Sequence, residues 1–444
     1  MEIKNKASKI DLLSFKQPHM RAFHMTWFSF FLAFFGWFGI APLMSIVRDD
    51  LGLTKQQIGN TIIASVGITV LVRLGIGWVL DRIGPRIAYT WLLIIGSFPV
   101  MLIGLSESYE SFLIFRLLIG AIGASFVITQ YHTSMMFSPN VVGTANATTA
   151  GWGNLGGGVT QMVMPLIFTA IVSLGIESSM GWRLAMVVPG VALFFMGIAY
   201  YFMTQDLPNG NFSDLRAKGE LPGRTSAKGS FREAIKDFRV WALFLAYAAC
   251  FGIELTINNI AAIYYIDNFK MDLKTAGLIA SLFGLMNLFA RTLGGVFGDK
   301  AGIKFGLKGR VGFLGIILLL EGISLVVFSR MDILHLAIIS MVIFSLFVQM
   351  AEGATYSIVP FVNKRALGAV SGIVGAGGNA GAVAAGFLFR DPNLSYQDAL
   401  LYTGMAVALT SVVTLLVRFS EQDEKKAMEE THFAIQQKTK ILQA

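Results

Sequence analysis

Long apolar stretches alternate with short polar connections along the whole chain. Twelve of these stretches approach or exceed the roughly 20 apolar residues that a helix needs to cross a bilayer. They cover approximately residues 22–47, 58–80, 86–106, 110–136, 142–174, 183–204, 239–266, 275–298, 311–329, 333–362, 366–389 and 397–418. The pattern therefore predicts an all-α membrane protein with twelve transmembrane helices.

A polar segment between the sixth and seventh stretches divides the chain into two halves. Its Gly, Pro and mixed charges are typical of a linker between two bundles of six helices. We expect a cytoplasmic N-terminal segment (1–21), an N-terminal six-helix bundle (22–204), a cytoplasmic linker (205–238), a C-terminal six-helix bundle (239–418) and a cytoplasmic tail (419–444). The sequence assigns no function to the tail.

Two glycine-rich stretches, residues 150–158 and 375–382, recur at a separation of about 220 residues, once in each half. Glycine weakens an isolated helix, so its use inside an apolar run indicates close approach between helices. Each copy carries one asparagine, Asn154 or Asn379, whose amide needs a polar partner in hydrocarbon. We interpret the copies as packing faces that present two amides to something polar between the halves. Their glycines are Gly151, Gly153, Gly156 and Gly157 in the first copy, and Gly378 and Gly381 in the second.

The first copy also matches the spacing of a dinucleotide-binding fingerprint, through Gly151, Gly153 and Gly156. That motif needs a strand before it, a helix after it and an acidic residue roughly 20 positions on. Both flanks here are long apolar runs, and the next acid, Glu177, falls in a predicted loop. The context excludes the nucleotide interpretation.

Two arginines, Arg73 and Arg291, lie in the middle of apolar stretches and again about 220 residues apart. An arginine at such depth cannot easily reach either membrane surface, which makes it a functional-site hypothesis by default. The same separation for arginines and glycine copies indicates that the two halves are pseudo-symmetric.

Charged residues follow each arginine at the end of its stretch. The segment 77–86 resembles the loop between the second and third helices of the major facilitator superfamily, and 295–302 is its partner in the second half. In that superfamily these charges brace the cytoplasmic helix ends and help to set the gate. Membrane anchoring alone would explain the basic residues, but not the paired aspartates. The gate charges are Asp81, Arg82, Arg86, Asp299 and Lys300. Arg116 resembles the superfamily's fourth-helix motif, for which we favour a structural or coupling role over substrate contact.

Composition supports a membrane protein. The 444 residues are 55% hydrophobic and 14% charged, against roughly 25% charged in soluble domains. The single Cys250 excludes a disulfide framework and a cysteine metal cluster, and the five histidines show no ligand spacing. We expect no metal, no cofactor and no enzymatic activity, because no nucleophile or carboxylate pair is arranged for chemistry.

The formal charge of +8 follows from topology. If the stretches alternate in direction, 25 Lys and Arg residues fall on the side of both termini and seven on the other. The positive-inside rule then places both termini in the cytoplasm, with the chain in the inner or plasma membrane of the cell. No nucleic-acid partner is needed to explain the charge, and no cleavable signal peptide is visible.

Several motifs together carry a resemblance to a family. The glycine stretches 150–158 and 375–382 look like the nitrate signatures of the nitrate/nitrite porter family within the major facilitator superfamily. Residues 181–183, 251–256 and 353–362 are most similar to its branch of high-affinity, proton-coupled nitrate transporters. The resemblance extends over nearly all twelve stretches and implies a carrier that works by alternating access, as a monomer.

The resemblance also implies a binding site. Arg73 and Arg291 correspond to the arginines that clamp the anion, with Asn154 and Asn379 in the signatures beside them. The aromatic residues that line the site correspond to Tyr247, Phe126 and Phe251, with Phe34 a weaker match.

Physical chemistry agrees with this assignment. Nitrate is planar and singly charged, and the planar donor fork of a guanidinium fits it better than the point charge of lysine does. Two arginines facing each other across a pseudo-two-fold axis would bind one such anion at the midplane. We expect the empty pair to leave two poorly compensated positive charges.

Nitrate uptake into a cell that is negative inside needs a driving ion, and the resemblance implies protons. The titratable groups at depth are Glu254, Glu352 and His132, although each also fits a helix-packing role. Burial disfavours the ionised form of such groups. The alternatives left open are nitrate/nitrite exchange without protons, a carrier of another small anion, and a nitrate-responsive receptor. The expected partners are nitrate, nitrite, protons and the lipid bilayer.

Overall fold

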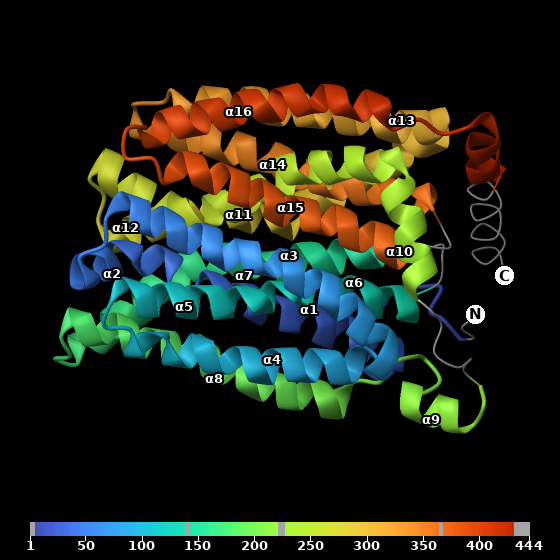
Figure 1. Cartoon of the computed structure of the whole chain (residues 1–444), viewed down its shortest axis with the longest axis horizontal. Helices are drawn as coiled ribbons and strands as arrows, with labels where there is room; N and C mark the ends of the chain where they lie inside the picture. The colour runs from blue at the N-terminus through green and yellow to red at the C-terminus, as the bar shows by residue number, and fades with distance from the viewer. Residues whose placement is uncertain (1–4, 138–141, 221–226, 364–366, 430–444) are drawn as a thin grey trace.

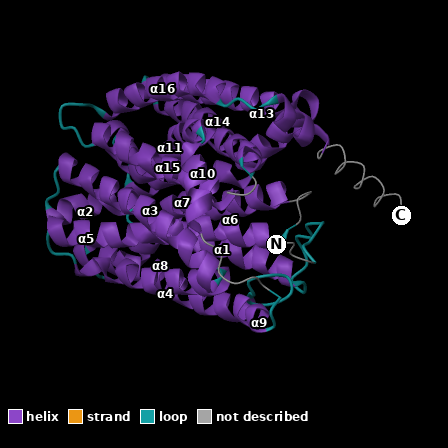
Figure 2. Ribbon diagram, turned by 45° about the vertical axis from the view of Figure 1, so that its right-hand side comes forward, coloured by secondary structure: helices purple, strands orange, loops and turns teal. Residues whose placement is uncertain are grey.

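The protein is a bundle of long helices that run side by side (Figure 1). The computed structural model describes residues 5–137, 142–220, 227–363 and 367–429, and this part of the chain contains helices and loops without an extended strand (Figure 2). Ten segments within it are long and apolar enough to cross a membrane. The predicted all-α membrane fold is confirmed.

The N-terminal half supplies six crossings. Its elements are α1 (Pro18–Phe38), η1 (Ala41–Leu43), α2 (Met44–Leu51), α3 (Lys55–Ile83), α4 (Pro85–Leu102), η2 (Ile103–Leu105), α5 (Tyr109–Gly120), η3 (Ala121–Ala124), α6 (Ser125–Met136), α7 (Val142–Ser173) and α8 (Ser178–Met203). The first predicted stretch is interrupted at η1, which contains Pro42, and the fourth is interrupted at η3.

The linker and the C-terminal half follow. The linker forms two short helices, α9 (Phe212–Ala217) and α10 (Ala227–Lys236). The second half comprises α11 (Phe238–Phe269), α12 (Leu273–Leu285), η4 (Met286–Leu288), α13 (Ala290–Ser329), α14 (Leu334–Val362), α15 (Leu367–Phe389), α16 (Tyr396–Val413) and η5 (Thr414–Leu416).

Ten candidate segments correspond to twelve crossings in the described chain. One segment, Leu273–Ser329, holds two of them, because α13 turns at Gly306, whose φ of 70° and ψ of −160° are not helical. Helix α3 adds the remaining crossing, since its 29 residues span about 43 Å at 1.5 Å per residue.

The halves meet along two helix pairs, α3 with α15 and α7 with α12. In Figure 1 these helices lie in the middle, with α4 and α8 on one side and α13 and α16 on the other. The glycines of the two copies allow these and neighbouring helices to approach closely. A Cβ on Gly156 would lie 2.1 Å from the carbonyl oxygen of Phe31 in α1, and one on Gly381 would lie 2.1 Å from that of Ala248 in α11.

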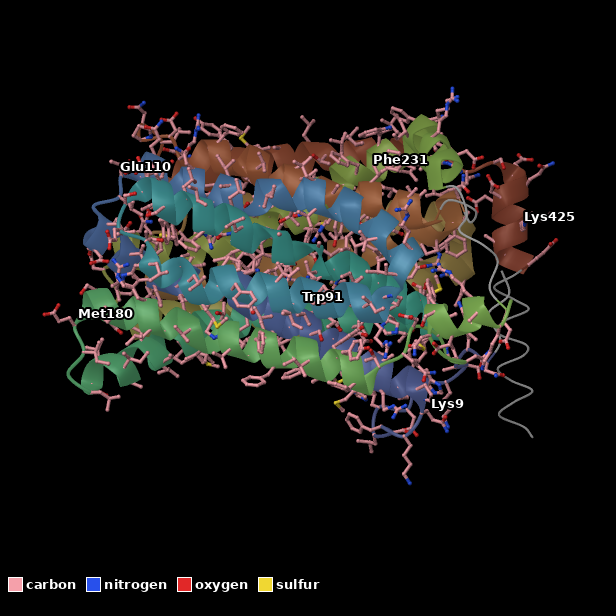
Figure 3. All side chains as sticks on the ribbon, turned by 60° about the horizontal axis from the view of Figure 1, so that its bottom comes forward. Lys9, Trp91, Glu110, Met180, Phe231 and Lys425 are labelled. Carbon is pink, nitrogen blue, oxygen red and sulfur yellow. The ribbon has the colours of Figure 1, made fainter. Side chains whose placement is uncertain are left out.

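Charged and apolar side chains are separated along the bundle. Figure 3 shows Glu110 at one end and Lys425 at the other, with Trp91 projecting between them. Trp91 is 55% exposed, as expected of a side chain that faces lipid. We call the end with α9 and α10 the linker end.

Candidate functional site

Arg73 of α3 and Arg291 of α13 lie together in the core of the bundle. Their side chains are 1% and 2% exposed. The two guanidinium carbons lie 5.1 Å and 5.9 Å from the centroid of the Phe126 ring. One cation from each half therefore faces the same aromatic ring, away from lipid.

Arg73 is held by backbone carbonyl groups. Its Nη1 donates to the carbonyl of Gly375 at 2.8 Å, and its Nε and Nη2 donate to the carbonyl of Gly123 at 3.2 Å and 3.1 Å. Gly375 belongs to the second glycine copy, so Arg73 reaches across to the other half. Arg73 forms no ion pair with an acid in the described chain, so its positive charge is not neutralised there.

Arg291 has acidic partners. Its Nη1 forms an ion pair with Oε2 of Glu352 in α14 and lies 3.9 Å from Oε2 of Glu254 in α11. Its Nη2 donates to the hydroxyl of Tyr247 at 2.8 Å. The expectation of two poorly compensated charges is therefore wrong for Arg291, because two carboxylates of its own half surround it.

Close backbone packing places Arg291 beside Glu352. Helix α13 restarts after Phe289, whose φ of −136° and ψ of −30° interrupt the preceding helical run. A Cβ on Gly353 would lie 2.1 Å from the carbonyl oxygen of Arg291, and one on Gly294 would lie 2.1 Å from that of Met350. Glycines on both helices thus bring α13 and α14 into contact at the level of the ion pair.

The two asparagines have different surroundings. Asn154 donates through Nδ2 to Oε2 of Glu254 at 3.0 Å, so its partner is an acid and not an arginine. Asn287 in η4 donates to Oε1 of the same carboxylate at 2.7 Å. Asn379 is fully buried, and neither atom of its amide has a hydrogen-bond partner in the described chain. Its amide is available to a ligand.

Aromatic rings form one wall of the site. Tyr247 and Phe251 stack at 5.1 Å, and Phe126 stacks on Phe251 at 6.0 Å. Tyr356 packs edge-on against Phe126 and Tyr247, with centroids 5.6 Å and 5.0 Å away. Phe34 is one ring further out, because it contacts Phe30 at 4.6 Å and Phe30 contacts Phe126 at 5.9 Å.

Sequence reasoning missed Tyr356, Asn287 and Phe30. Tyr356 lies four residues after Glu352 within the motif 353–362, so it shares a face of α14 with that acid. That spacing could have identified it. Asn287 and Phe30 become recognisable only when their helices are packed.

The third proposed proton-coupling residue, His132, is placed elsewhere. Its Nδ1 lies 2.5 Å from the hydroxyl of Tyr200, and its Nε2 lies 2.9 Å from the carbonyl oxygen of Gln205 in the linker. These bonds tie α6 to α8 and to the linker, and they do not connect His132 to the arginines.

Another buried acid, Glu321 of α13, lies within electrostatic range of Glu352. Both of its carboxyl oxygens lack a hydrogen-bond partner in the described chain. An ionised carboxylate without a donor is costly in such surroundings, which favours the neutral form.

The gate charges lie at the linker end. Arg310 bridges the turn at Gly306 by pairing with Asp299 at 2.5 Å, and Lys300 lies over the Phe297 ring at 5.5 Å. The carbonyl of Arg82 accepts a bond from Arg216 of α9. The side chain of Asp81 lies outside the described residues.

The linker carboxylate Asp206 holds the loop before α4. It accepts from the backbone N–H of Arg86 at 2.8 Å and from that of Phe212 at 2.9 Å. Burial raises the pKa of Asp206, and the two N–H donors oppose that change. Gly84 leaves room for the carboxylate, since a Cβ there would lie 2.5 Å from it at a φ of 82°. The linker is thus fastened to the gate loop.

Side chains join the two halves at the end opposite the linker. Arg48 of α2 pairs with Asp267 of α11 at 3.1 Å, and Arg390 donates to Asn60 at 3.1 Å. Nearer the middle, Arg116 donates to Asn259 of α11 at 2.9 Å. This bond between halves gives Arg116 a bracing role.

Comparison with known proteins gives a consistent assignment. The profile of the Major Facilitator Superfamily matches residues 26–435. The fold is similar to that of a bacterial homolog of the human lysosomal transporter Spinster, in an inward-facing and occupied conformation. The TM-score is 0.68 at 16% identity, over 90% of this chain and 97% of that one.

Closer similarity is found in sequence. The high-affinity nitrate transporter 2.3 of Oryza sativa subsp. japonica is 39% identical, over 94% of this chain and 81% of its own length. The nitrate transporter 2.1 of Chlamydomonas reinhardtii is 38% identical, over 92% and 77%. The nitrate/nitrite transporter NrtP of a Picosynechococcus strain is 30% identical, over 81% and 83%.

Proposed function

Because this chain belongs to the major facilitator superfamily, within its family of high-affinity nitrate transporters, we propose that it carries nitrate across the membrane together with protons. The superfamily consists of transporters and not of enzymes. The observation that carries the proposal is the pair of buried arginines, one from each half, whose guanidinium groups lie 5.1 Å and 5.9 Å from the centroid of the same Phe126 ring.

The site suits a small, flat, singly charged anion. Arg73 contributes a positive charge without an acidic partner in the described chain, and the free amide of Asn379 adds donors. Stacked rings of Phe126 and Phe251 leave little polar surface for the hydration shell of a larger carboxylate. A delocalised anion loses less on leaving water than a compact one does, which favours nitrate.

Proton coupling follows from competition for Arg291. Glu352 occupies Nη1 of that guanidinium, and an incoming anion needs the same donors. Two arginines and two carboxylates balance in charge, so an added anion leaves one negative charge in excess. Protonation of Glu352 restores the balance and frees the guanidinium, because a buried uncompensated charge is costly. Nitrate and a proton thus favour each other's binding.

Several groups act on Glu352 and contribute to this balance. The charged or acidic ones are Arg291, Glu254 and Glu321, and the neutral titratable ones are Tyr247, Cys250 and Tyr356. Among these groups only Arg291 is a cation. An anion that binds Arg291 therefore removes the one positive charge that stabilises ionised Glu352.

The test is nitrate uptake into proteoliposomes with and without an imposed pH gradient. We expect an inward proton gradient to drive nitrate accumulation. Liposomes with Arg73→Lys, which keeps the positive charge but is expected to lower uptake, serve as the control. Nitrate accumulation that ignores the gradient but requires internal nitrite would support exchange. Uptake blocked better by formate or acetate than by nitrite would point to a different anion.

Nitrite is a second candidate substrate. The Picosynechococcus relative is named a nitrate/nitrite transporter, and nitrite is also a small planar anion.

We also propose an orientation in the membrane. The linker end, with its excess of Lys and Arg, faces the cytoplasm with both termini, and the carrier works as a monomer in the plasma or inner membrane.

A further inference from the structure

The carboxylate of Glu254 is bonded by amides from both halves. Its Oε2 accepts from Asn154 of α7 at 3.0 Å, and its Oε1 accepts from Asn287 of η4 at 2.7 Å. The carbonyl oxygens of both asparagine side chains lack a partner in the described chain. Each amide is therefore oriented by Glu254 through one bond, and the bond to Asn154 crosses between the halves.

The oxygen that binds Asn154 also has a second partner within reach. Oε2 of Glu254 lies 3.9 Å from Nη1 of Arg291, the same nitrogen that Glu352 holds. While Glu352 is ionised, it satisfies Nη1 and leaves Glu254 to the amide. A protonated Glu352 leaves Glu254 as the nearest carboxylate to that nitrogen.

We propose that Glu254 is a positioning residue that releases the contact between the halves when Glu352 takes up a proton. The inference rests on the proton coupling proposed above. A bond between two charged groups is stronger than one between a carboxylate and a neutral amide, so, until an anion takes Nη1, Oε2 moves to Arg291 and Asn154 is set free. In this step Glu352 takes up the proton, and Glu254 acts as the hydrogen-bond acceptor that changes partner.

The step connects chemistry in one half to movement between halves. The charged groups facing Glu254 are Arg291 of α13 and Glu352 of α14, both in its own half. From the other half it receives the neutral amide of Asn154. Protonation of Glu352 therefore changes only the interactions that Glu254 makes within its own half. The bond that breaks is the one to Asn154 in the other half.

The chain supplies a matched control. Gln161, also on α7, donates to the backbone carbonyl of Asn258 on α11 at 2.5 Å. This bond joins the same two helices but involves no titratable group. Gln161→Ala removes a contact between the halves without touching the carboxylate.

The experiment measures the distance between halves as pH is varied without nitrate. Spin labels are placed on cysteines introduced at Ile83 and Ile303, which are 38% and 44% exposed at the linker end, and the protein is reconstituted in nanodiscs. The native Cys250 is buried and does not interfere. Uptake into proteoliposomes is measured in parallel.

We expect the wild-type distance distribution to shift on acidification, and Asn154→Ala to show the acid distribution already at neutral pH. In Glu254→Gln the amides can still bond after one of them flips, but the charge is absent, so the shift is lost. We expect its maximal uptake rate to fall by a larger factor than its KM for nitrate rises, because Glu254 acts on the contact between the halves and does not itself bind the anion. Glu254→Asp restores part of the pH response, and Gln161→Ala keeps all of it.

A wild-type distribution that does not respond to pH overturns the inference, even if no variant folds. So does an equal response in Asn154→Ala and Gln161→Ala. Failure of the proposed function is seen separately, as wild-type uptake that ignores the proton gradient. Gradient-driven uptake with an unchanged response in Asn154→Ala rejects the role of Glu254 alone.

Discussion

Arg73 and Arg291 occupy corresponding places in the two halves but differ in what balances their charge. Arg73 is bonded to the carbonyl groups of Gly123 and Gly375, whereas Arg291 is paired with Glu352 and lies close to Glu254. Pseudo-symmetry of the backbone thus does not extend to electrostatics. Arg73 supplies a positive charge that no acid pairs with in the described chain. The charge of Arg291 is paired with Glu352 while that acid is ionised and becomes available when it is protonated.

Removing either guanidinium should have the largest effect, and the loss of stability should differ between the two arginines. Arg291→Ala leaves two carboxylates in the core without a cation, which costs about 3–5 kcal/mol of stability. Arg73→Ala leaves only carbonyl groups unpaired, at about 1–3 kcal/mol. Thermal unfolding of the purified variants measures the difference, and adding Glu352→Gln to Arg291→Ala should recover part of the loss. Greater damage from Arg73→Ala would contradict the assignment of charges.

Changing each arginine to lysine keeps the charge but removes the planar donor fork. Arg73→Lys and Arg291→Lys should each lower nitrate uptake by about tenfold to a hundredfold, as expected for the loss of charge-assisted bonds worth about 1.5–3 kcal/mol. Uptake is normalised to the amount of reconstituted protein. Wild-type rates in both lysine variants would remove the clamp from the mechanism.

The acid beside Arg291 should give the two sites different pH behaviour. Wild-type uptake is expected to rise as the external pH falls, because protonated Glu352 releases the guanidinium for nitrate. In Glu352→Gln the side chain is neutral at every pH, so the uptake should lose most of this dependence. Uptake measured over a pH series tests this. A retained pH profile would move proton coupling to another group, with Glu321 the next to be substituted.

Substitution of Phe126, the ring that both arginines contact, should have the smallest effect. Phe126→Leu removes contacts worth about 0.5–2 kcal/mol, so stability should fall by up to that amount and the KM for nitrate should rise a few-fold. Phe34→Leu serves as the control, because Phe34 lies one ring further from the arginines. Equal effects of the two variants would show that the ring acts by packing alone.

The crossings and the two arginines could be predicted because hydrocarbon penalises charge so strongly that each exception is visible in the sequence. The resemblance also brought Tyr247, Phe126 and Phe251 to the site. The partners of the polar groups could not be predicted in the same way. Whether Asn154 meets an arginine or Glu254 depends on the rotation of α7 against α11, which apolar periodicity does not fix.

The pairing of Arg291 with Glu352 illustrates the same limit. Both residues were identified, but for separate tasks, one for the anion and one for the proton. Their contact depends on the approach of α13 to α14 at Gly294 and Gly353, which are 59 positions apart. His132 is singled out by the sequence in the same way, and the structure places it apart from the arginines, bonded to Tyr200 and Gln205, so its part in proton coupling stays a prediction.

Where α7 crosses α12, Gly158 and Gly284 meet backbone to backbone, with room for no Cβ on either. Interlocked side chains at this crossing would have to disengage before the two halves could tilt. Because no side chains interlock there, we expect the two halves to tilt about this crossing during the proposed transport. A single methyl group added there would collide with the facing backbone and should block this movement without contacting the bound anion.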